Sequence, residues 1–421
     1  MDTYLHRVAD ILLAEALRRM GAVLIRGPKW CGKTRTAEEL AESILYVQDP
    51  DKTRTYLEMA EIEPSRLLEG ATPRLLDEWQ LAPSLWNAVR FSIDKRQKNG
   101  QFILTGSAVP KKDTTMHSGT GRIARIHMRP MSLFESREST GAVSLRALFD
   151  GAQEIVGESP LPLEGIAFVI ARGGWPRAVA EGGDDSLMLP NDYLDATVES
   201  DISTIDGIER NPTWARALIR SFARNTAQQA SLQTIREDMQ GDGITISERT
   251  VTDYVNALRR LFVLDECPAW SPKMRSKRAV RTSPTWHLSD PSIAVAALRA
   301  KPSRLLDDLG TMGFLFESLC VRDLRVYSSA LDGSVFHFRD QRGLEVDAIV
   351  QLNDGRWGAI EVKLGGQSRI EEACNKLEYF IKRLDTEVVQ EPVFKLVLTA
   401  GEYAYQRKDG TKVVPLACLG P

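Results

Sequence analysis

Residues 22–34 read AVLIRGPKWCGKT, and this stretch decides the fold of the first part of the chain. Residues 22–26 form an apolar run of the length of a buried strand, and residues 35–43 (RTAEELAES) are typical of a helix. Between them, residues 27–34 match GxxxxGK[ST], the loop pattern that binds phosphate groups when it joins a strand to a helix. The stretch therefore predicts a phosphate-binding loop at the edge of a parallel sheet.

The residue types in this loop explain the expected chemistry. Glycines let the backbone wrap closely around phosphate groups, and the N–H groups at the start of a helix point toward the anion. Lys33 is long enough to reach the β- and γ-phosphates, and the hydroxyl of Thr34 is a ligand for Mg²⁺. We expect ATP to be bound by the loop and its first helical residues: Gly27, Pro28, Lys29, Trp30, Cys31, Gly32, Lys33, Thr34 and Arg35.

A second acidic motif, LLDE, lies at residues 75–78 and is followed by WQLAP. Arg74 and Pro73 interrupt the apolar run before it. Asp77 is expected to hold the metal ion, and Glu78 is expected to polarise the attacking water. Together with the loop, this motif predicts hydrolysis of a nucleoside triphosphate.

The next strand-like run, residues 101–107 (QFILTGS), ends in two hydroxyl side chains. Because ligands bind at the carboxyl ends of parallel strands, Thr105 or Ser107 is expected to sense the γ-phosphate, unless these residues only terminate the strand. Arg122 and Arg125 follow a loop rich in Thr, Ser and Gly. Either one is a candidate arginine finger for a neighbouring subunit, or else a surface arginine.

Composition limits the classes of protein to consider. The chain has 421 residues, which predicts two to four domains at roughly 150 residues each. Lys and Arg total 54 and Asp and Glu total 57, so the net charge of −3 excludes a polycation but allows local basic patches. No run approaches the about 18 apolar residues of a membrane span, so no membrane association is expected. The scattered cysteines, without a CxxC pair, favour a reducing, cytoplasmic location. They are Cys31, Cys267, Cys320, Cys374 and Cys418.

Residues 213–272 have the outline of a winged helix-turn-helix. Ser231 and Ser247 are predicted to cap two short helices, and a β-like stretch (LFVLDECPAW) follows at residues 261–270. The exposed face of the second helix offers side chains that suit DNA, or a protein partner that uses the same fold. They are Arg249, Thr252, Asn256, Arg259 and Arg260.

A basic strip follows this segment and has two interpretations. One is contact with the phosphates of double-stranded DNA, and the other is a solvated linker. The strip comprises Lys273, Arg275, Lys277, Arg278 and Arg281.

The C-terminal part contains a predicted β-hairpin. Residues 344–350 alternate as a strand should, Asn-Asp-Gly at 353–355 is a turn signal, and residues 357–363 form the return strand. A three-residue loop places Asp347 opposite Glu361, and Lys363 shares a face with Glu361. A helical stretch upstream supplies Glu317.

This set of side chains looks like the core of a PD-(D/E)xK nuclease. Asp347 and Glu361 are expected to hold Mg²⁺ together with the Val362 carbonyl, and Lys363 is expected to orient the attacking water. Glu317 matches the remaining acidic position. The alternative is a silent binding module that holds little or no metal.

Five motifs in order resemble the AAA-type ATPases that carry a DUF4143 region. They are GPKWCGKT, LLDEWQLAP, FILTGSA, GRIARIHMRPMSLFES and the Gly-Gly-Trp-Pro turn at residues 173–176. Trp30 and Cys31 stand where the resemblance leads us to expect a smaller polar or aliphatic pair.

The resemblance implies an α/β chain in four parts. These are a P-loop NTPase core (1–160), a helical lid that shares the nucleotide (161–212), a winged helix-turn-helix (213–272) and a restriction-endonuclease-like α/β domain (273–421). It also implies self-association into a ring, with a hexamer favoured.

Three functions remain open at this point. The favoured one is an ATPase that couples its nucleotide state to DNA engagement, with or without Mg²⁺-dependent cleavage. The alternative is a nucleotide-driven signalling or assembly switch that binds protein, with a nuclease-like scaffold. A sequence-specific transcription factor is disfavoured, because it needs neither an ATPase core nor a nuclease-like domain.

Overall fold

The N-terminal lobe is built on a five-stranded sheet that contains the phosphate-binding loop. The computed structural model describes residues 4–107, 119–271, 283–384 and 389–421. All strand pairs of the sheet are parallel, in the order β2-β3-β4-β1-β5. The strands are β1 (Ala22–Arg26), β2 (Ser43–Tyr46), β3 (Arg74–Asp77), β4 (Phe102–Gly106) and β5 (Ile123–His127).

Helices cover both faces of this sheet, as the alternation of side chains along a strand requires. On β1, Val23 and Ile25 belong to the core cluster formed with α1, whereas Ala22 and Leu24 belong to the cluster formed with α4. Buried on both faces, β1 reads as a continuous apolar run over residues 22–25. The helices are α1 (Val8–Arg19), α2 (Lys33–Glu38), α3 (Thr53–Ile62) and α4 (Ser84–Arg96).

The C-terminal sheet recruits strands from before the helical region. It has seven strands, in the order β7-β12-β13-β11-β10-β9-β8, and a separate two-stranded sheet pairs β14 with β6. The strands are β6 (Val143–Ser144), β7 (Gly157–Glu158), β8 (Gly333–Arg339), β9 (Glu345–Leu352), β10 (Trp357–Lys363), β11 (Phe394–Thr399), β12 (Tyr403–Gln406), β13 (Lys412–Pro415) and β14 (Leu419–Gly420). Helices α5 (Leu145–Phe149) and α16 (Gln367–Arg383) accompany them.

The pairing of β6 and β7 corrects the boundary expected at residue 160. Tyr403 pairs with Glu158, and Leu419 pairs with Val143. Residues 143–158 therefore belong with the C-terminal sheets, through β6 and β7 at the two ends of this segment, and not with the ATPase core. The physical reason is that β12 and β14 supply the hydrogen-bond partners that the backbone groups of these short strands need.

Between β7 and β8 the chain forms a helical region. Its helices are α6 (Leu163–Arg172), α7 (Pro176–Glu181), α8 (Leu189–Ala196), α9 (Ile202–Thr204), α10 (Pro212–Arg224), α11 (Leu232–Gly241), α12 (Glu248–Arg260), α13 (Pro291–Ala297), α14 (Pro302–Asp307) and α15 (Leu309–Ser329). A π-helical turn, Thr197–Asp201, connects α8 to α9. The segments 161–212 and 213–272 contribute to the same apolar core cluster, which also extends into the C-terminal sheet.

Two predictions about this region are confirmed. The hydroxyl oxygens of Ser231 and Ser247 accept hydrogen bonds from backbone N–H groups and cap α11 and α12. After α12 the chain forms antiparallel bridges, Leu264 with Leu288 and Cys267 with Thr285. The basic strip of residues 273–281 lies outside the described residues.

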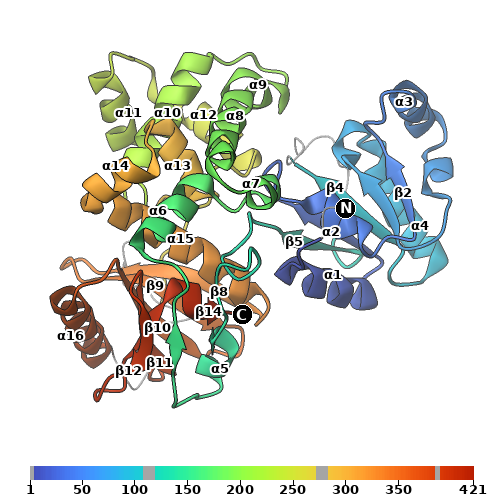
Figure 1. Ribbon diagram of the computed structural model, residues 1–421. Coiled ribbons are helices and arrows are strands. Elements are labelled where there is room, and N and C mark those ends of the chain that lie inside the picture. The colour runs from blue at the N-terminus through green and yellow to red at the C-terminus, as the bar shows by residue number, and fades with distance from the viewer. Residues whose placement is uncertain (1–3, 108–118, 272–282, 385–388) are drawn as a thin grey trace.

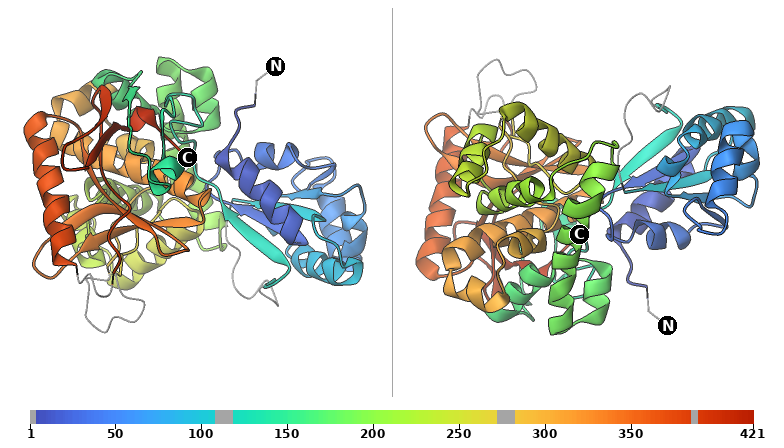
Figure 2. Two further views of the ribbon diagram at one scale, coloured as in Figure 1. Left: turned by 90° about the horizontal axis from the view of Figure 1, so that it is seen from below. Right: turned by 90° about the horizontal axis from the view of Figure 1, so that it is seen from above.

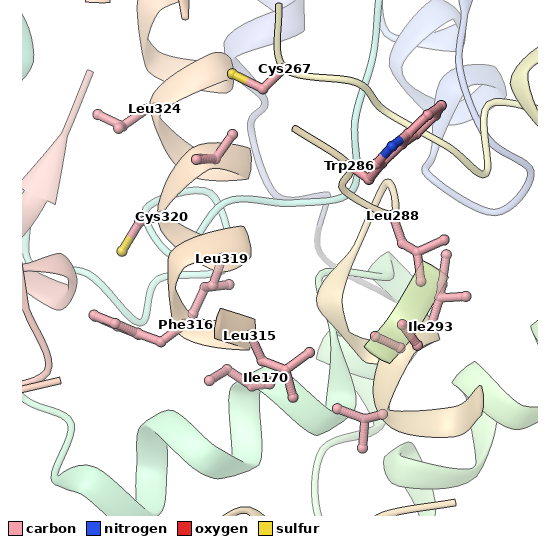
Figure 3. Packing of buried hydrophobic residues seen from close by; sticks show 14 of the residues in the cluster. Ile170, Cys267, Trp286, Leu288, Ile293, Leu315, Phe316, Leu319, Cys320 and Leu324 are labelled. Atoms are coloured by element: carbon pink, nitrogen blue, oxygen red, sulfur yellow. The ribbon is translucent and has the colours of Figure 1, made fainter. Parts of the chain in front are cut away.

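Helix α15 joins the helical region to the C-terminal sheet. Figure 3 shows Leu315 beside Ile170 of α6, with Leu319 and Leu324 further along the same helix. Figures 1 and 2 show the P-loop sheet as one lobe, and the helical region with the C-terminal sheet as the other. None of the helices in the described ranges has the length and apolar character that a bilayer crossing needs.

The Gly-Gly-Trp-Pro turn is explained by close packing between these two lobes. A Cβ atom on Gly174 would lie 2.1 Å from the carbonyl oxygen of Met131, on the segment that leaves β5. Next to it, the indole N–H of Trp175 donates to Ser292 Oγ at 3.0 Å. Only a glycine lets the two backbones approach this closely.

Gly174→Ala is therefore expected to lower the free energy of unfolding by about 3 kcal/mol, because the added methyl group forces two backbones apart. Urea unfolding followed by tryptophan fluorescence checks this. Gly241→Ala is the matched control, since its Cβ meets nothing within 4 Å at the end of α11. Equal urea midpoints for the two variants would contradict the packing argument.

Candidate functional site

The phosphate-binding loop connects β1 to α2, as the sequence predicts. Gly32 has φ 97°, a left-handed conformation that suits glycine, and the helix begins at Lys33. Lys33 is buried, and its Nζ donates to the carbonyl oxygens of Gly27 at 3.1 Å and Pro28 at 2.7 Å. The ammonium group thus lies inside the loop, where the resemblance expects it to meet phosphate.

Asp77 is the last residue of β3, and its carboxylate accepts hydrogen bonds from three separate segments of the chain. Thr34 Oγ1 donates to Oδ1 of Asp77 at 2.8 Å, and Gln48 Nε2 donates to Oδ2 at 2.6 Å. Thr105 Oγ1, from the end of β4, also donates to Oδ1. The Thr34 hydroxyl and the Asp77 carboxylate, which are expected to bind Mg²⁺, are therefore adjacent. Both offer oxygen atoms, the type of ligand that Mg²⁺ prefers.

Glu78 follows in the left-handed conformation, with φ 54°. Its Oε2 accepts hydrogen bonds from Gln80 Nε2 and, at 3.2 Å, from Ser107 Oγ. The two candidate sensors of β4 thus divide their contacts. Thr105 binds the expected metal ligand, whereas Ser107 binds the expected catalytic carboxylate.

Side chains at the tip of the loop face the helical region. Lys29 Nζ lies 2.6 Å from Asp201 Oδ1, at the end of the π-helical turn. The Trp30 ring meets Tyr193 of α8 edge-on at 5.6 Å between centroids, and Tyr193 stacks on Trp175 at 4.5 Å. The contact with Tyr193 accommodates the large side chain of Trp30, and it brings the loop into direct contact with the helical region.

Of the remaining predicted loop residues, Cys31 points into the protein core and Arg35 lies at the surface. Cys31 is fully buried in the core under α1. Arg35 forms surface ion pairs with Glu38 at 3.3 Å and with Glu39 at 2.7 Å.

The two candidate finger arginines lie at the β5 side of the P-loop lobe. Arg122 is 44% exposed and its Nε lies 2.9 Å from Asp94 Oδ1. The guanidinium carbon of Arg125 lies 5.8 Å from the ring centroid of Trp86. Whether either serves a neighbouring subunit stays a prediction.

Sequence reasoning missed several residues of this site. Gln48 and Gln80 bind the two key carboxylates, and Arg7 donates to the Cys31 carbonyl at 2.8 Å from a buried position. A cavity of about 490 Å³ also opens beside the loop, between Tyr4 and Pro176. In the sequence, the signal for Gln48 is its place two residues after Tyr46, where β2 ends.

The C-terminal hairpin has the predicted register. Trp357 pairs with Gln351 and Ile360 with Ala348, so Asp347 falls opposite Glu361. Next to this pair, a side chain replaces a backbone acceptor between the two strands. The Val362 N–H donates to Asp347 Oδ2 at 2.8 Å. The two carboxylates therefore meet on one edge of β9 and β10.

Two lysines neutralise this pair. Lys363 Nζ lies 3.1 Å from Glu361 Oε2 and 3.4 Å from Asp347 Oδ2. Lys376 of α16, which sequence reasoning missed, lies 2.9 Å from Glu361 Oε1 and 3.7 Å from Asp347 Oδ1. Lys376 comes thirteen positions after Lys363 in an amphipathic helix, where nothing local distinguishes it from a surface lysine.

Glu317 faces the same cluster from α15 and lines a polar cavity of about 430 Å³ with Asp347. Burial raises the pKa of the Glu317 carboxyl well above its usual range, and Asp347 and Glu361 raise it further. Burial and Asp347 also raise the pKa of Glu361 to about 7. Burial lowers the pKa of Lys363 and Lys376, but Asp347 and Glu361 outweigh it, so both lysines stay charged.

The arrangement at the hairpin does not fit a divalent ion. The expected donors are the carboxylates of Asp347 and Glu361 and the carbonyl of Val362, and each already contacts an ammonium group. Over the described ranges, no three or more His, Cys, Asp or Glu side chains are grouped so as to hold a metal ion. A Mg²⁺ ion at Asp347 and Glu361, as predicted from the sequence, would therefore require these ammonium groups to move, and the site itself stays a prediction.

The face of α12 expected to meet DNA is partly occupied by the protein itself. Arg249 is exposed, but Arg259 pairs with Glu266, and Arg260 Nη1 lies 3.2 Å from Asp206 Oδ2. Thr252 donates its hydroxyl to a carbonyl of its own helix, and Asn256 accepts from Arg259.

Comparison with known families separates the chain into three matched segments. An AAA domain model matches residues 19–136, a domain of unknown function (DUF8612) matches 163–304, and a domain of unknown function (DUF4143) matches 312–419. The DUF8612 match covers helices α6 to α13 and the first residues of α14, whereas most of α15 falls in the DUF4143 match.

Two curated mycobacterial relatives align with most of the chain. They are the uncharacterized proteins Rv2008c of Mycobacterium tuberculosis (strain ATCC 25618 / H37Rv) and Mb2031c of Mycobacterium bovis (strain ATCC BAA-935 / AF2122/97). Each is 21% identical over 364 residues, which cover 85% of this chain and 73% of the relative.

Among solved structures, the Walker-type ATPase PABY2304 of Pyrococcus abyssi aligns with 70% of this chain and 96% of its own, at 14% identity and a TM-score of 0.43.

Proposed function

Because the chain joins an AAA-type P-loop ATPase domain to a C-terminal DUF4143 domain, we propose that it hydrolyses ATP and couples its nucleotide state to engagement of double-stranded DNA. One observation carries the ATPase proposal. Asp77 is bonded to Thr34 and Thr105, with Glu78 next in the chain, so the groups needed for metal binding and water activation converge beside Lys33.

In the proposed reaction, Lys33 leaves the carbonyls of Gly27 and Pro28 and binds the β- and γ-phosphates. Thr34 and Asp77 would hold Mg²⁺, which neutralises phosphate charge when bound. Glu78, oriented by Ser107 and Gln80, accepts a proton from the attacking water.

The cavity of about 490 Å³ beside the loop is the proposed place of the adenine base. Tyr4, Leu5 and Pro176 give it apolar walls, and Arg7 and Gly32 lie at its loop side. A volume in this range matches those of ligand pockets in general.

Coupling to the rest of the chain is proposed to run through the loop tip. Lys29 contacts Asp201 and Trp30 contacts Tyr193, so a nucleotide that repositions the loop also repositions the helical region. That region carries α10, α11 and α12 followed by antiparallel bridges, which is the element order of a winged helix. Exposed Arg249 at the start of α12 is the proposed DNA contact.

Self-association completes the proposal. A ring, with a hexamer favoured by the family resemblance, would bring Arg122 or Arg125 of one subunit to the nucleotide of the next. The exposed position of Arg122 at the edge-strand side of the lobe supports this arrangement.

The second candidate is a nucleotide-driven switch that binds protein. It is favoured by the internal ion pairs of Arg259 and Arg260 and by the lysines that occupy the hairpin carboxylates. Both features leave fewer free charges for DNA and for metal-dependent cleavage.

Steady-state ATP hydrolysis, measured with and without double-stranded DNA, distinguishes DNA engagement from the protein-binding switch. Lys33→Ala is the blank. We expect severalfold stimulation by DNA, and Arg249→Ala is expected to reduce it because it removes a phosphate contact. Arg54→Ala is the matched control, since Arg54 is an exposed arginine on the opposite lobe. Hydrolysis that is indifferent to DNA would favour the protein-binding switch.

A further inference from the structure

A second lysine, Lys376, pairs with the hairpin carboxylates of Asp347 and Glu361, and the sequence did not predict it. The resemblance accounts for Lys363, which lies two residues after Glu361 on the same strand. Lys376 comes from α16, which packs against β10 as Figure 1 shows. Its ammonium bridges both oxygens of Glu361, at 2.9 Å to Oε1 and 3.0 Å to Oε2, and lies 3.7 Å from Asp347 Oδ1.

We propose that Lys376 is a built-in counter-ion that excludes divalent cations from the Asp347–Glu361 pair, so that the site binds such an ion only when Lys376 is displaced. The position of its ammonium between the two carboxylates is the position that a bridging cation needs. A divalent ion cannot occupy this position while the Lys376 ammonium is there, because the two positive charges would overlap in space and repel strongly at such short range.

Because Glu361 is buried, its carboxylate depends on a nearby positive charge for stabilisation. The side chain of Glu361 is 0% exposed, whereas those of Lys376 and Lys363 are each 26% exposed. Removing one of its two ammonium partners leaves an under-compensated carboxylate away from water, which costs free energy unless another cation takes the place. A divalent ion from solution is the natural replacement.

Lys376 fits the role better than Lys363 does. Lys363 Nζ is also held by the Val362 carbonyl at 2.9 Å, close to its own backbone. Lys376 reaches the carboxylates from a separate helix, and its contacts are with these two side chains alone among those described. Movement of that side chain alone would therefore open the site without disturbing the hairpin.

The test is Mn²⁺ binding to the full chain without nucleotide, measured by titration calorimetry. Lys376→Met is expected to bind Mn²⁺ with an affinity about tenfold or more above that of the unchanged protein, because a competing charge is gone. Lys382→Met is the matched control on the same helix, since Lys382 is exposed and pairs with Glu378. It is expected to leave Mn²⁺ affinity unchanged.

Two further measurements fix the interpretation. Adding Asp347→Asn to Lys376→Met is expected to abolish the gained affinity, which places the ion at the hairpin. Mn²⁺ is also expected to raise the unfolding temperature of Lys376→Met but not that of the unchanged protein, since ligands stabilise the state that binds them.

Tight Mn²⁺ binding by the unchanged protein that Asp347→Asn removes would overturn the proposal, whether or not the Lys376 variants fold. So would equal affinities of Lys376→Met and the unchanged protein. Lys376→Gln keeps a hydrogen-bond donor and serves if the methionine variant is unstable. Because the readout needs neither ATP nor DNA, its failure is distinct from a failure of the proposed ATPase function.

Discussion

Glu78→Gln is expected to keep ATP binding and to lower turnover by roughly 100-fold or more, the usual contribution of a general base. Glutamine preserves the shape of the side chain and can still accept from Ser107 and Gln80. It cannot take a proton from water, so only the chemical step suffers.

Single-turnover hydrolysis and equilibrium binding of a fluorescent ATP analogue measure the two quantities separately. Glu63→Gln serves as the control, because Glu63 is an exposed carboxylate on the same lobe, paired only with Arg66 among the described residues. Unchanged turnover in Glu78→Gln would move the role of general base to another residue.

Lys33→Ala is expected to weaken ATP binding by about 100-fold, since it removes charge-assisted hydrogen bonds to two phosphates. The side chain is buried inside the loop and already bonds two loop carbonyls. Its loss therefore also removes contacts that shape the loop.

The same fluorescent analogue measures this loss, with Lys95→Ala as control for the removal of an exposed lysine from the last turn of α4. Retained tight binding in Lys33→Ala would contradict the assignment of the loop. Together the two variants separate binding, which needs Lys33, from turnover, which needs Glu78.

Features that depend on neighbours in the sequence were determined by the sequence itself. The strand, loop and helix around Lys33 follow from an apolar run, two glycines and a helix-forming stretch. The helix caps at Ser231 and Ser247 need only a hydroxyl and the next backbone N–H groups. The register that sets Asp347 opposite Glu361 follows from a three-residue loop, because side-chain direction alternates strictly along each strand.

Contacts between distant segments were decided only by the tertiary structure. Strands β6 and β7 pair with β14 and β12, which follow them by more than two hundred positions, and no local pattern specifies such a partner. Gln48 and Lys376 resemble ordinary polar surface residues in the sequence. Their functions arise because folding brings them to Asp77 and Glu361, where burial makes an unpaired carboxylate costly and a hydrogen-bond or ion-pair partner necessary.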